Sequence, residues 1–161
     1  MSADDPILRP PASARQPAQP AASLGFRIKE SYRVRYEEVD SYGVVNHAQF
    51  ADYFTGARVA YFRALGIKPA EFHTLPIQPV VVHLEVDFRS PVRFDDHLDV
   101  WARCTAVGEK SLSFSFRVHD AASDVLLAEG KAVLVAMEIA ARTPVRVPDA
   151  LRRRIEKMEG R

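Results

Sequence analysis

The sequence has little cysteine and almost no net charge. Cys104 is the single cysteine among 161 residues, which excludes an internal disulfide and suits a reducing cytoplasm. The 22 basic and 21 acidic side chains give a formal net charge of +1, and the two signs are interspersed along the chain. No extended basic surface is expected, so we predict a cytoplasmic protein without a nucleic-acid partner.

Long apolar runs are also missing. No run approaches the roughly 18 residues that a membrane-spanning helix needs, so no association with a membrane is predicted. Residues 1–24 instead hold five prolines among alanines and show no apolar periodicity. Such a composition cannot bury enough surface to fold, and we predict a disordered Pro/Ala-rich tail. Residues 25–161 are long enough for one domain with a single core.

Several chemical motifs are absent as well. No glycine-rich phosphate loop occurs, and the serines in residues 111–115 lack the Gly-x-Ser-x-Gly pattern of a serine-hydrolase nucleophile. The histidines beyond residue 70 show no metal-ligand spacing with one another or with carboxylates; these are His73, His83, His97 and His119. We therefore predict no metal and no other cofactor.

What the sequence does contain begins with a strand, a turn and a helix. Residues 31–38 alternate apolar and polar side chains, which predicts a half-buried strand. Residues 39–47 follow as a turn, in which Gly43 is free to adopt a positive φ. Asn46 is then expected to be the N-cap of a helix that runs to about Leu65.

This helix is apolar on most of its sides, which is typical of a helix enclosed by other elements. Gly56 in its middle costs about 1 kcal/mol relative to alanine, so we expect another backbone or a ligand to approach it closely. Gly66 is placed to end the helix as the residue after its C-cap.

Four alternating segments come next; these are residues 80–89, 98–105, 111–118 and 125–138. In the first of them, Val80, Val82 and Leu84 are expected on one face. Short polar turns separate the last three segments, so these are expected to pair antiparallel. The arginines of residues 152–154 are expected on the solvated face of a short C-terminal helix.

Together these elements predict an α+β domain, in which an antiparallel sheet of about five strands wraps around one long central helix. One helix leaves the outer face and the edge strands of such a sheet uncovered. We therefore predict a homodimer or a homotetramer.

The turn before the helix carries the strongest functional signal. The carboxylate of Asp40 precedes a helix N-terminus, where unpaired backbone N–H groups and the positive end of the helix dipole converge. A base or nucleophile beside such an anion site is the minimum that attack on a carbonyl group requires. An alternative is that Asp40 only caps the turn, because aspartate is a common turn residue.

Residues 36–50 resemble the signature of the 4-hydroxybenzoyl-CoA thioesterase-like family of hotdog-fold enzymes. The segment has two acids around one residue, then two residues, a glycine, an apolar pair and a short polar step into an aromatic residue. Residues 88–98 resemble the second strand and turn of that family, residues 128–130 its final strand, and residues 142–151 its proline-rich C-terminal close. The likeness implies the hotdog fold.

The resemblance also assigns roles to residues of this chain. Asp40 matches the catalytic aspartate, which attacks the thioester carbonyl or activates the water that does so. The backbone N–H of His47 matches the donor that polarises the thioester oxygen, while its side chain would be a general acid, a supporting contact or a pocket wall. Gly43 matches the point where the turn approaches the substrate. Glu38 stands where the first acid is usually aspartate, and it is expected to set the turn geometry.

Other residues around the helix start are expected to meet the substrate. Gln49, Phe50 and Tyr53 would form walls of an acyl pocket between the helix and a neighbouring subunit. Asn46 would either contact the substrate or cap the helix. Thr55 stands where the family often has a glutamate.

The resemblance implies an acyl-CoA thioesterase, which hydrolyses a thioester of coenzyme A or of acyl carrier protein to a free carboxylic acid and a thiol. No metal or redox cofactor is implied. Two alternatives remain open. A hydratase or dehydratase of the same fold would use the His47 side chain as its catalytic group, and a non-catalytic module would bind acyl-CoA without turnover.

Overall fold

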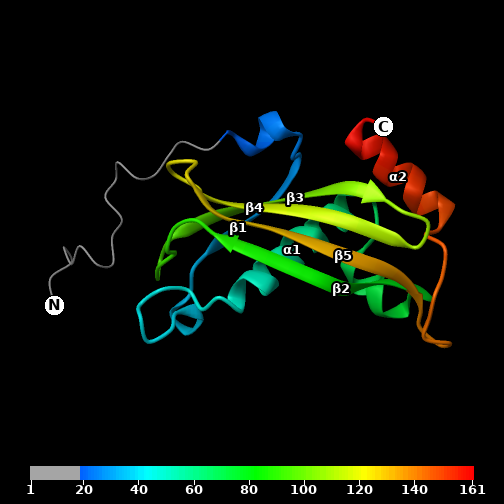
Figure 1. The fold of residues 1–161 in the computed structure, drawn as a ribbon, viewed down its shortest axis with the longest axis horizontal. Helices are drawn as coiled ribbons and strands as arrows, with labels where there is room; N and C mark the ends of the chain where they lie inside the picture. The colour runs from blue at the N-terminus through cyan, green and yellow to red at the C-terminus, as the bar shows by residue number, and fades with distance from the viewer. Residues whose placement is uncertain (1–18) are drawn as a thin grey trace, which may run out of the picture.

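The structure is a computed structural model that describes residues 19–161, and within them one curled antiparallel sheet is accompanied by two α-helices (Figure 1). The strands are β1 (Ile28–Arg33), β2 (Ile77–Phe88), β3 (His97–Val107), β4 (Ser111–Asp120), β5 (Leu126–Glu138) and β6 (Thr143–Pro144). Their order is β1-β3-β4-β5-β2, and β6 pairs with β5. The predicted fold class, a sheet around one long helix with a short C-terminal helix, is confirmed.

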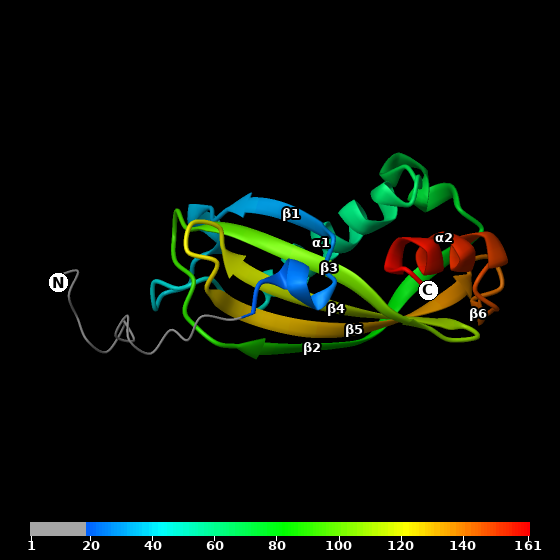
Figure 2. The same cartoon turned by 90° about the horizontal axis from the view of Figure 1, so that it is seen from above.

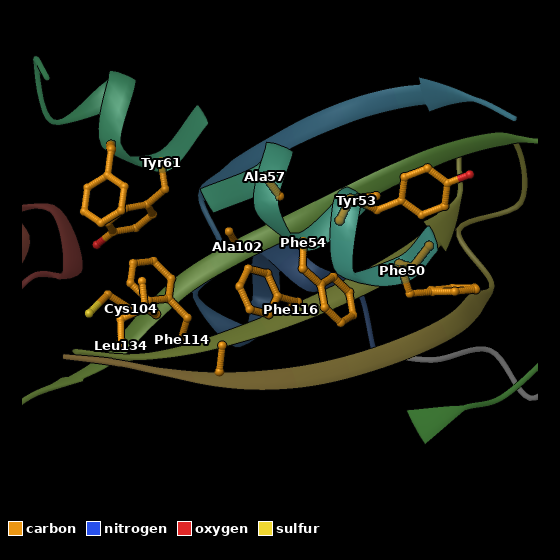
Figure 3. Packing of buried hydrophobic residues seen from close by; sticks show 14 of the residues in the cluster. Phe50, Tyr53, Phe54, Ala57, Tyr61, Ala102, Cys104, Phe114, Phe116 and Leu134 are labelled. Atoms are coloured by element: carbon orange, nitrogen blue, oxygen red, sulfur yellow. The ribbon is translucent and has the colours of Figure 1, made fainter. Parts of the chain in front are cut away.

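The long helix α1 (Gln49–Ala64) lies along the inner face of the curled sheet, and the C-terminal helix α2 (Asp149–Glu159) lies near one end (Figure 2). Phe54 of α1 stacks on Phe116 with ring centroids 4.6 Å apart, and Tyr61 meets Phe114 edge-on at 5.1 Å (Figure 3). Each such buried ring contributes about 1.5–3 kcal/mol to stability. The predicted enclosure of the helix is confirmed.

The first predicted strand, residues 31–38, is wrong at both ends. The observed strand ends at Arg33, and Tyr36–Glu38 form a short 3-10 helix, η3. Glu38 causes this change, because its carboxylate accepts hydrogen bonds from the backbone N–H of Arg35 at 2.8 Å and from its guanidinium at 3.0 Å. These bonds close the chain into a turn and take it out of the sheet.

The predicted helix starts later than expected. Its first residue is Gln49, and the side chain of Asn46 accepts a hydrogen bond of 2.9 Å from the backbone N–H of Ala48. Asn46 therefore closes the turn that leads into the helix. The helix ends at Ala64, and Gly66 has the left-handed conformation expected after a C-cap, with φ +81°.

The close approach predicted at Gly56 is confirmed, but the approaching group is a side chain. A Cβ atom at this position would overlap the hydroxyl of Tyr32 on β1. Glycine is therefore needed where β1 crosses α1.

The predicted alternation of β2 is broken by a bulge at Val82, which has no partner on β5. Val81 lies opposite the buried Leu134, so Val81 shares the inner face with Leu84 in place of Val80. A bulge inserts one extra residue and reverses the alternation beyond it. The assignment of Val80 to that face is wrong for this reason.

The ordered body begins before the predicted boundary at residue 25. Ala21–Leu24 form a 3-10 helix, η2, in which Ala21 is buried. The guanidinium of Arg103 donates a hydrogen bond of 2.6 Å to the carbonyl of Leu24. Of the tail predicted for residues 1–24, residues 1–18 lie outside the described residues.

The arginines of residues 152–154 do not all face solvent as predicted. Arg152 donates hydrogen bonds to the carbonyls of Val107 and Gly108, and Arg154 donates one to the carbonyl of Leu65. Two of the three arginines therefore hold α2 to the body of the domain.

Candidate active site

The predicted turn is a closed loop. Val39 and Val45 form an isolated antiparallel bridge, and the backbone N–H of Asp40 donates to the carbonyl of Val44 at 2.9 Å. Gly43 has φ +76°, a conformation that favours glycine, and its N–H returns to the carbonyl of Asp40 at 3.0 Å. The loop thus holds Asp40 in a fixed place.

One carboxylate oxygen of Asp40 accepts a hydrogen bond within the described residues, and the other does not. Oδ1 accepts a hydrogen bond of 2.8 Å from the backbone N–H of Tyr42. This bond is the turn-capping role that the sequence left open. Oδ2 accepts no hydrogen bond from residues 19–161 and remains available to a substrate or a water molecule.

The backbone N–H of His47 is also free. The next two amides are occupied, because Asn46 accepts the N–H of Ala48 with its side chain and that of Gln49 with its carbonyl. No acceptor for the His47 amide occurs in the part of the chain that the structure describes. The residues that lead into α1 thus leave one donor free near the positive end of the helix.

Asp40 and His47 line one cavity of about 370 Å³. The remaining wall residues come from the loop, from the first turn of α1, and from the end of β2 and the segment after it; these are Val44, Val45, Phe50, Phe88, Arg89, Ser90, Pro91 and Val92. The rings of Phe50 and Phe88 meet edge-on at 5.0 Å. Asp40, His47 and an apolar wall therefore share one cavity.

The wall from Phe88 to Val92 was not predicted to belong to the site. The N–H groups of Arg89 and Ser90 both donate to the carbonyl of Leu127, which fixes this segment at the end of β2. The sequence signal for this wall was the resemblance of residues 88–98 to the family. That resemblance does not show which end of the helix the segment contacts.

Glu38 connects the loop to α1. Its buried carboxylate accepts a hydrogen bond of 2.9 Å from the hydroxyl of Tyr53, in addition to those from Arg35. Burial alone would raise the pKa of Glu38, but the bonds from the Arg35 backbone, Tyr53 and the Arg35 guanidinium outweigh it and hold the pKa below its usual value. Glu38 also accepts the N–H of Asn46 with its backbone carbonyl at 2.8 Å.

Four predicted substrate-binding residues do not line this cavity. Gly43 and Asn46 are exposed on the loop, and the side-chain amide of Gln49 donates to Asp52 at 3.2 Å. Tyr53 is buried, and its hydroxyl is bound to Glu38. A role for these four residues in binding substrate stays a prediction.

The cationic side chain at the cavity is already paired. The guanidinium of Arg89 donates to Glu129 at 2.6 Å, and this bond raises the pKa of Arg89. Among residues 19–161 there is no group of three or more histidine, cysteine or acidic side chains that could hold a metal ion. No helix in the same range is long and apolar enough to cross a membrane.

Comparison with known proteins identifies similar chains. The sequence profile of the thioesterase-like superfamily matches residues 34–155. The acyl-CoA thioester hydrolase YbgC of Escherichia coli O157:H7 is 28% identical over 119 residues, which cover 74% of this chain and 88% of that protein.

Two solved structures from Thermus thermophilus are similar over most of their length. One is a thioesterase complexed with coenzyme A and Zn; it is 32% identical with a TM-score of 0.74, and the match covers 85% of this chain and 97% of that one. The other, the protein TT1821, is 29% identical with a TM-score of 0.76, and the match covers 82% of this chain and 99% of that one.

Proposed function

The chain belongs to the thioesterase-like superfamily, and from this membership we propose that it hydrolyses an acyl-CoA thioester at the Asp40 cavity. Membership confirms the family resemblance and the hotdog fold that the sequence predicted, and it makes the protein a thioester hydrolase. The activities named for the relatives point to a coenzyme A thioester as the substrate. A thioester of acyl carrier protein is the alternative substrate, and the same reaction would hydrolyse it.

The proposed reaction uses the two groups that lack an internal partner. The thioester oxygen accepts a hydrogen bond from the His47 amide, which stabilises the negative charge that develops on it. A donor of this kind is worth roughly 3–4 kcal/mol at the transition state. Asp40 Oδ2 either attacks the carbonyl carbon, giving an anhydride that water opens, or removes a proton from the attacking water.

Both routes give the same products. The carbon–sulfur bond breaks, the sulfur leaves as a thiolate that takes up a proton, and the acyl group leaves as a carboxylate carrying one oxygen from water. Neither route needs a metal ion. The observation that carries the proposal is that Asp40, which has a free carboxylate oxygen, and His47, which has a free backbone amide, line one apolar-walled cavity.

We also propose a homodimer formed through β2. This strand is at the edge of the sheet, and its apolar side chains are exposed; these are Val80, Val81, Val82, Leu84 and Phe88. Free edge strands with apolar side chains pair readily with another strand. Antiparallel pairing about the centre of β2 would place the Phe88 end of one copy beside the Ile77 end of the other. The second copy would then cover the open side of the Asp40 cavity.

The two alternatives are less well supported. A hydratase needs a histidine beside an acid, but the His47 side chain is exposed and makes no ion pair with any carboxylate of the described residues. A non-catalytic module would not need a free Asp40 oxygen next to the free amide. Binding of acyl-CoA without turnover would favour it.

A thiol-release assay over a panel of acyl-CoA thioesters tests the proposal. Asp40→Asn is expected to lower kcat by at least about a hundredfold, because a positioned carboxylate is lost. Asp52→Asn is the matched control, since Asp52 is an exposed carboxylate on α1 outside the cavity, and its kcat should be unchanged. Equal turnover by wild type and Asp40→Asn would exclude the proposed role.

A further inference from the structure

A second cavity lies at the other end of α1. Its volume is about 180 Å³, and it is formed by the last turns of α1, the 3-10 helix η4 (Pro69–Thr74), the start of β2 and α2. Its wall is mostly apolar; the apolar side chains include Val59, Phe62, Ile67, Phe72, Ile77 and Leu151. An apolar cavity of about 150 Å³ is large enough to hold a benzene molecule, so this one accommodates a single ring or a short alkyl chain.

One charged side chain, Arg58, lines this cavity. Arg58 is half-buried, and it makes no hydrogen bond or ion pair with the residues that the structure describes. Burial lowers the pKa of its guanidinium, and no neighbouring carboxylate opposes this effect. The other polar lining residue, Gln78, is already bonded to the carbonyl of Leu75 at 3.1 Å.

The state of Arg58 differs from that of Arg103 and Arg152, which are also half-buried. The half-buried guanidinium of Arg103 is bonded to Glu159 and to the carbonyl of Leu24, and that of Arg152 is bonded to two carbonyls. Even partial removal of a guanidinium from water without a partner is unfavourable, so an acceptor supplied from outside would stabilise Arg58.

We propose that this cavity, the Arg58 pocket, binds a small apolar group that carries a carboxylate, with the apolar part inside and the carboxylate on Arg58. The planar guanidinium matches a carboxylate in a two-point contact, and such charge-assisted bonds are about twice as strong as neutral ones. The apolar wall and the single cation together select this combination over a purely apolar or purely polar ligand.

Two sources supply such a group. One is a free carboxylic acid, the class of product that thioester hydrolysis releases. The other, which rests on the proposed function and the proposed dimer, is the distal carboxylate of an acyl group bound at Asp40 of the second copy. Pairing through β2 would place the Ile77 end of one chain, with its Arg58 pocket, beside the Asp40 cavity of the other.

Direct binding tests the pocket independently of turnover. Benzoate and its neutral analogue benzamide are titrated into the full chain by calorimetry, and the site is located from NMR shifts at the amides of Val59 and Phe62. Benzoate is expected to bind at least about tenfold more tightly than benzamide, and Arg58→Met to remove that preference. Arg58→Lys keeps the charge and should retain part of the preference for benzoate. Arg63→Met removes an exposed arginine of the same helix and should retain the whole preference.

Equal affinity for benzoate and benzamide, or NMR shifts confined to the Asp40 cavity, would overturn the proposal. Thermal unfolding of each variant establishes that it is folded. If Arg58→Met does not fold, the test rests on Arg58→Lys. Absence of benzoate binding would not bear on hydrolysis by Asp40. Likewise, unchanged turnover by Asp40→Asn would not bear on benzoate binding.

A second measurement separates the two sources. kcat/KM is compared for acyl-CoA thioesters of increasing length, each with and without a terminal carboxylate. A preference for the carboxylated series that Arg58→Met lowers about tenfold assigns the pocket to the acyl group. If Arg58→Met does not change the ratio of kcat/KM between the two series, while wild type still prefers benzoate to benzamide, the Arg58 pocket is assigned to a free acid.

Discussion

The hydroxyl of Tyr53 on α1 donates a hydrogen bond of 2.9 Å to the carboxylate of Glu38, two residues before Asp40. Glu38 is only 6% exposed and Tyr53 only 1%, so this bond is formed inside the domain. It fixes the start of the loop that carries Asp40 to the helix that follows the His47 amide. The distance between the proposed nucleophile and the proposed oxyanion donor is therefore controlled by a pair that need not touch substrate.

Glu38 should make stability depend on pH. Its pKa is lowered in the folded state, so its contribution is present above the pKa of the unfolded chain, about 4.3, and is lost as the pH falls through the lower folded value. Glu38→Gln removes the charge and keeps the shape. Urea unfolding from pH 7 to pH 3 should show a wild-type advantage that is constant above about pH 5 and shrinks below it.

The exposed Glu37 provides the control for this titration, because Glu37→Gln should leave the pH profile close to wild type. A difference between wild type and Glu38→Gln that does not change with pH would show that the ionisation of Glu38 does not contribute to stability.

Gly56 and Tyr32 should be coupled. Alanine normally stabilises a helix interior by about 1 kcal/mol relative to glycine. Gly56→Ala should instead destabilise this protein by about 1–3 kcal/mol, because the new methyl group would collide with the Tyr32 hydroxyl. In a Tyr32→Phe background the hydroxyl is gone, and the cost should fall by at least about 1 kcal/mol. Additive effects in a denaturant double-mutant cycle would contradict this explanation.

One half of the candidate site was predictable because it is contiguous. Asp40 and His47 lie within one turn and the approach to one helix, and turn and capping preferences act over just such short distances. The second half was not predictable in the same way. Phe88 reaches Phe50 only because β2 lies next to β5 at the edge of the sheet, which is a relationship between distant segments.

Two local errors have the same origin. The alternation of residues 31–38 predicted a strand, but Glu38 bonds back to Arg35 and ends it, so a side chain overrode the pattern. The bulge at Val82 depends on the pairing with β5, and the sequence of β2 alone contains no sign of it.

Glu159 should hold the C-terminal helix in place. Its buried carboxylate accepts hydrogen bonds from the Tyr61 hydroxyl at 2.7 Å, from the Arg103 guanidinium at 3.1 Å and from the Cys104 amide at 3.1 Å. Glu159→Ala leaves these donors unsatisfied and should lower the free energy of unfolding by about 3–5 kcal/mol. Lys157 on the same turn of α2 is exposed, and Lys157→Ala should lower the free energy of unfolding by less than about 0.5 kcal/mol. Equal costs in urea unfolding would show that the contacts of Glu159 do not stabilise the docking of α2.

The oxyanion role assigned to a backbone amide can be separated from the imidazole of His47. His47→Pro removes the N–H, and no hydrogen bond among the described residues is lost with it, because this N–H has no acceptor there. His47→Ala removes the imidazole and keeps the N–H. If the amide holds the thioester oxygen, His47→Pro should lower kcat by about 10²–10³ while the alanine variant stays within about tenfold of wild type. Thermal unfolding checks that both variants fold, and equal losses in kcat would transfer the role from the amide to the side chain.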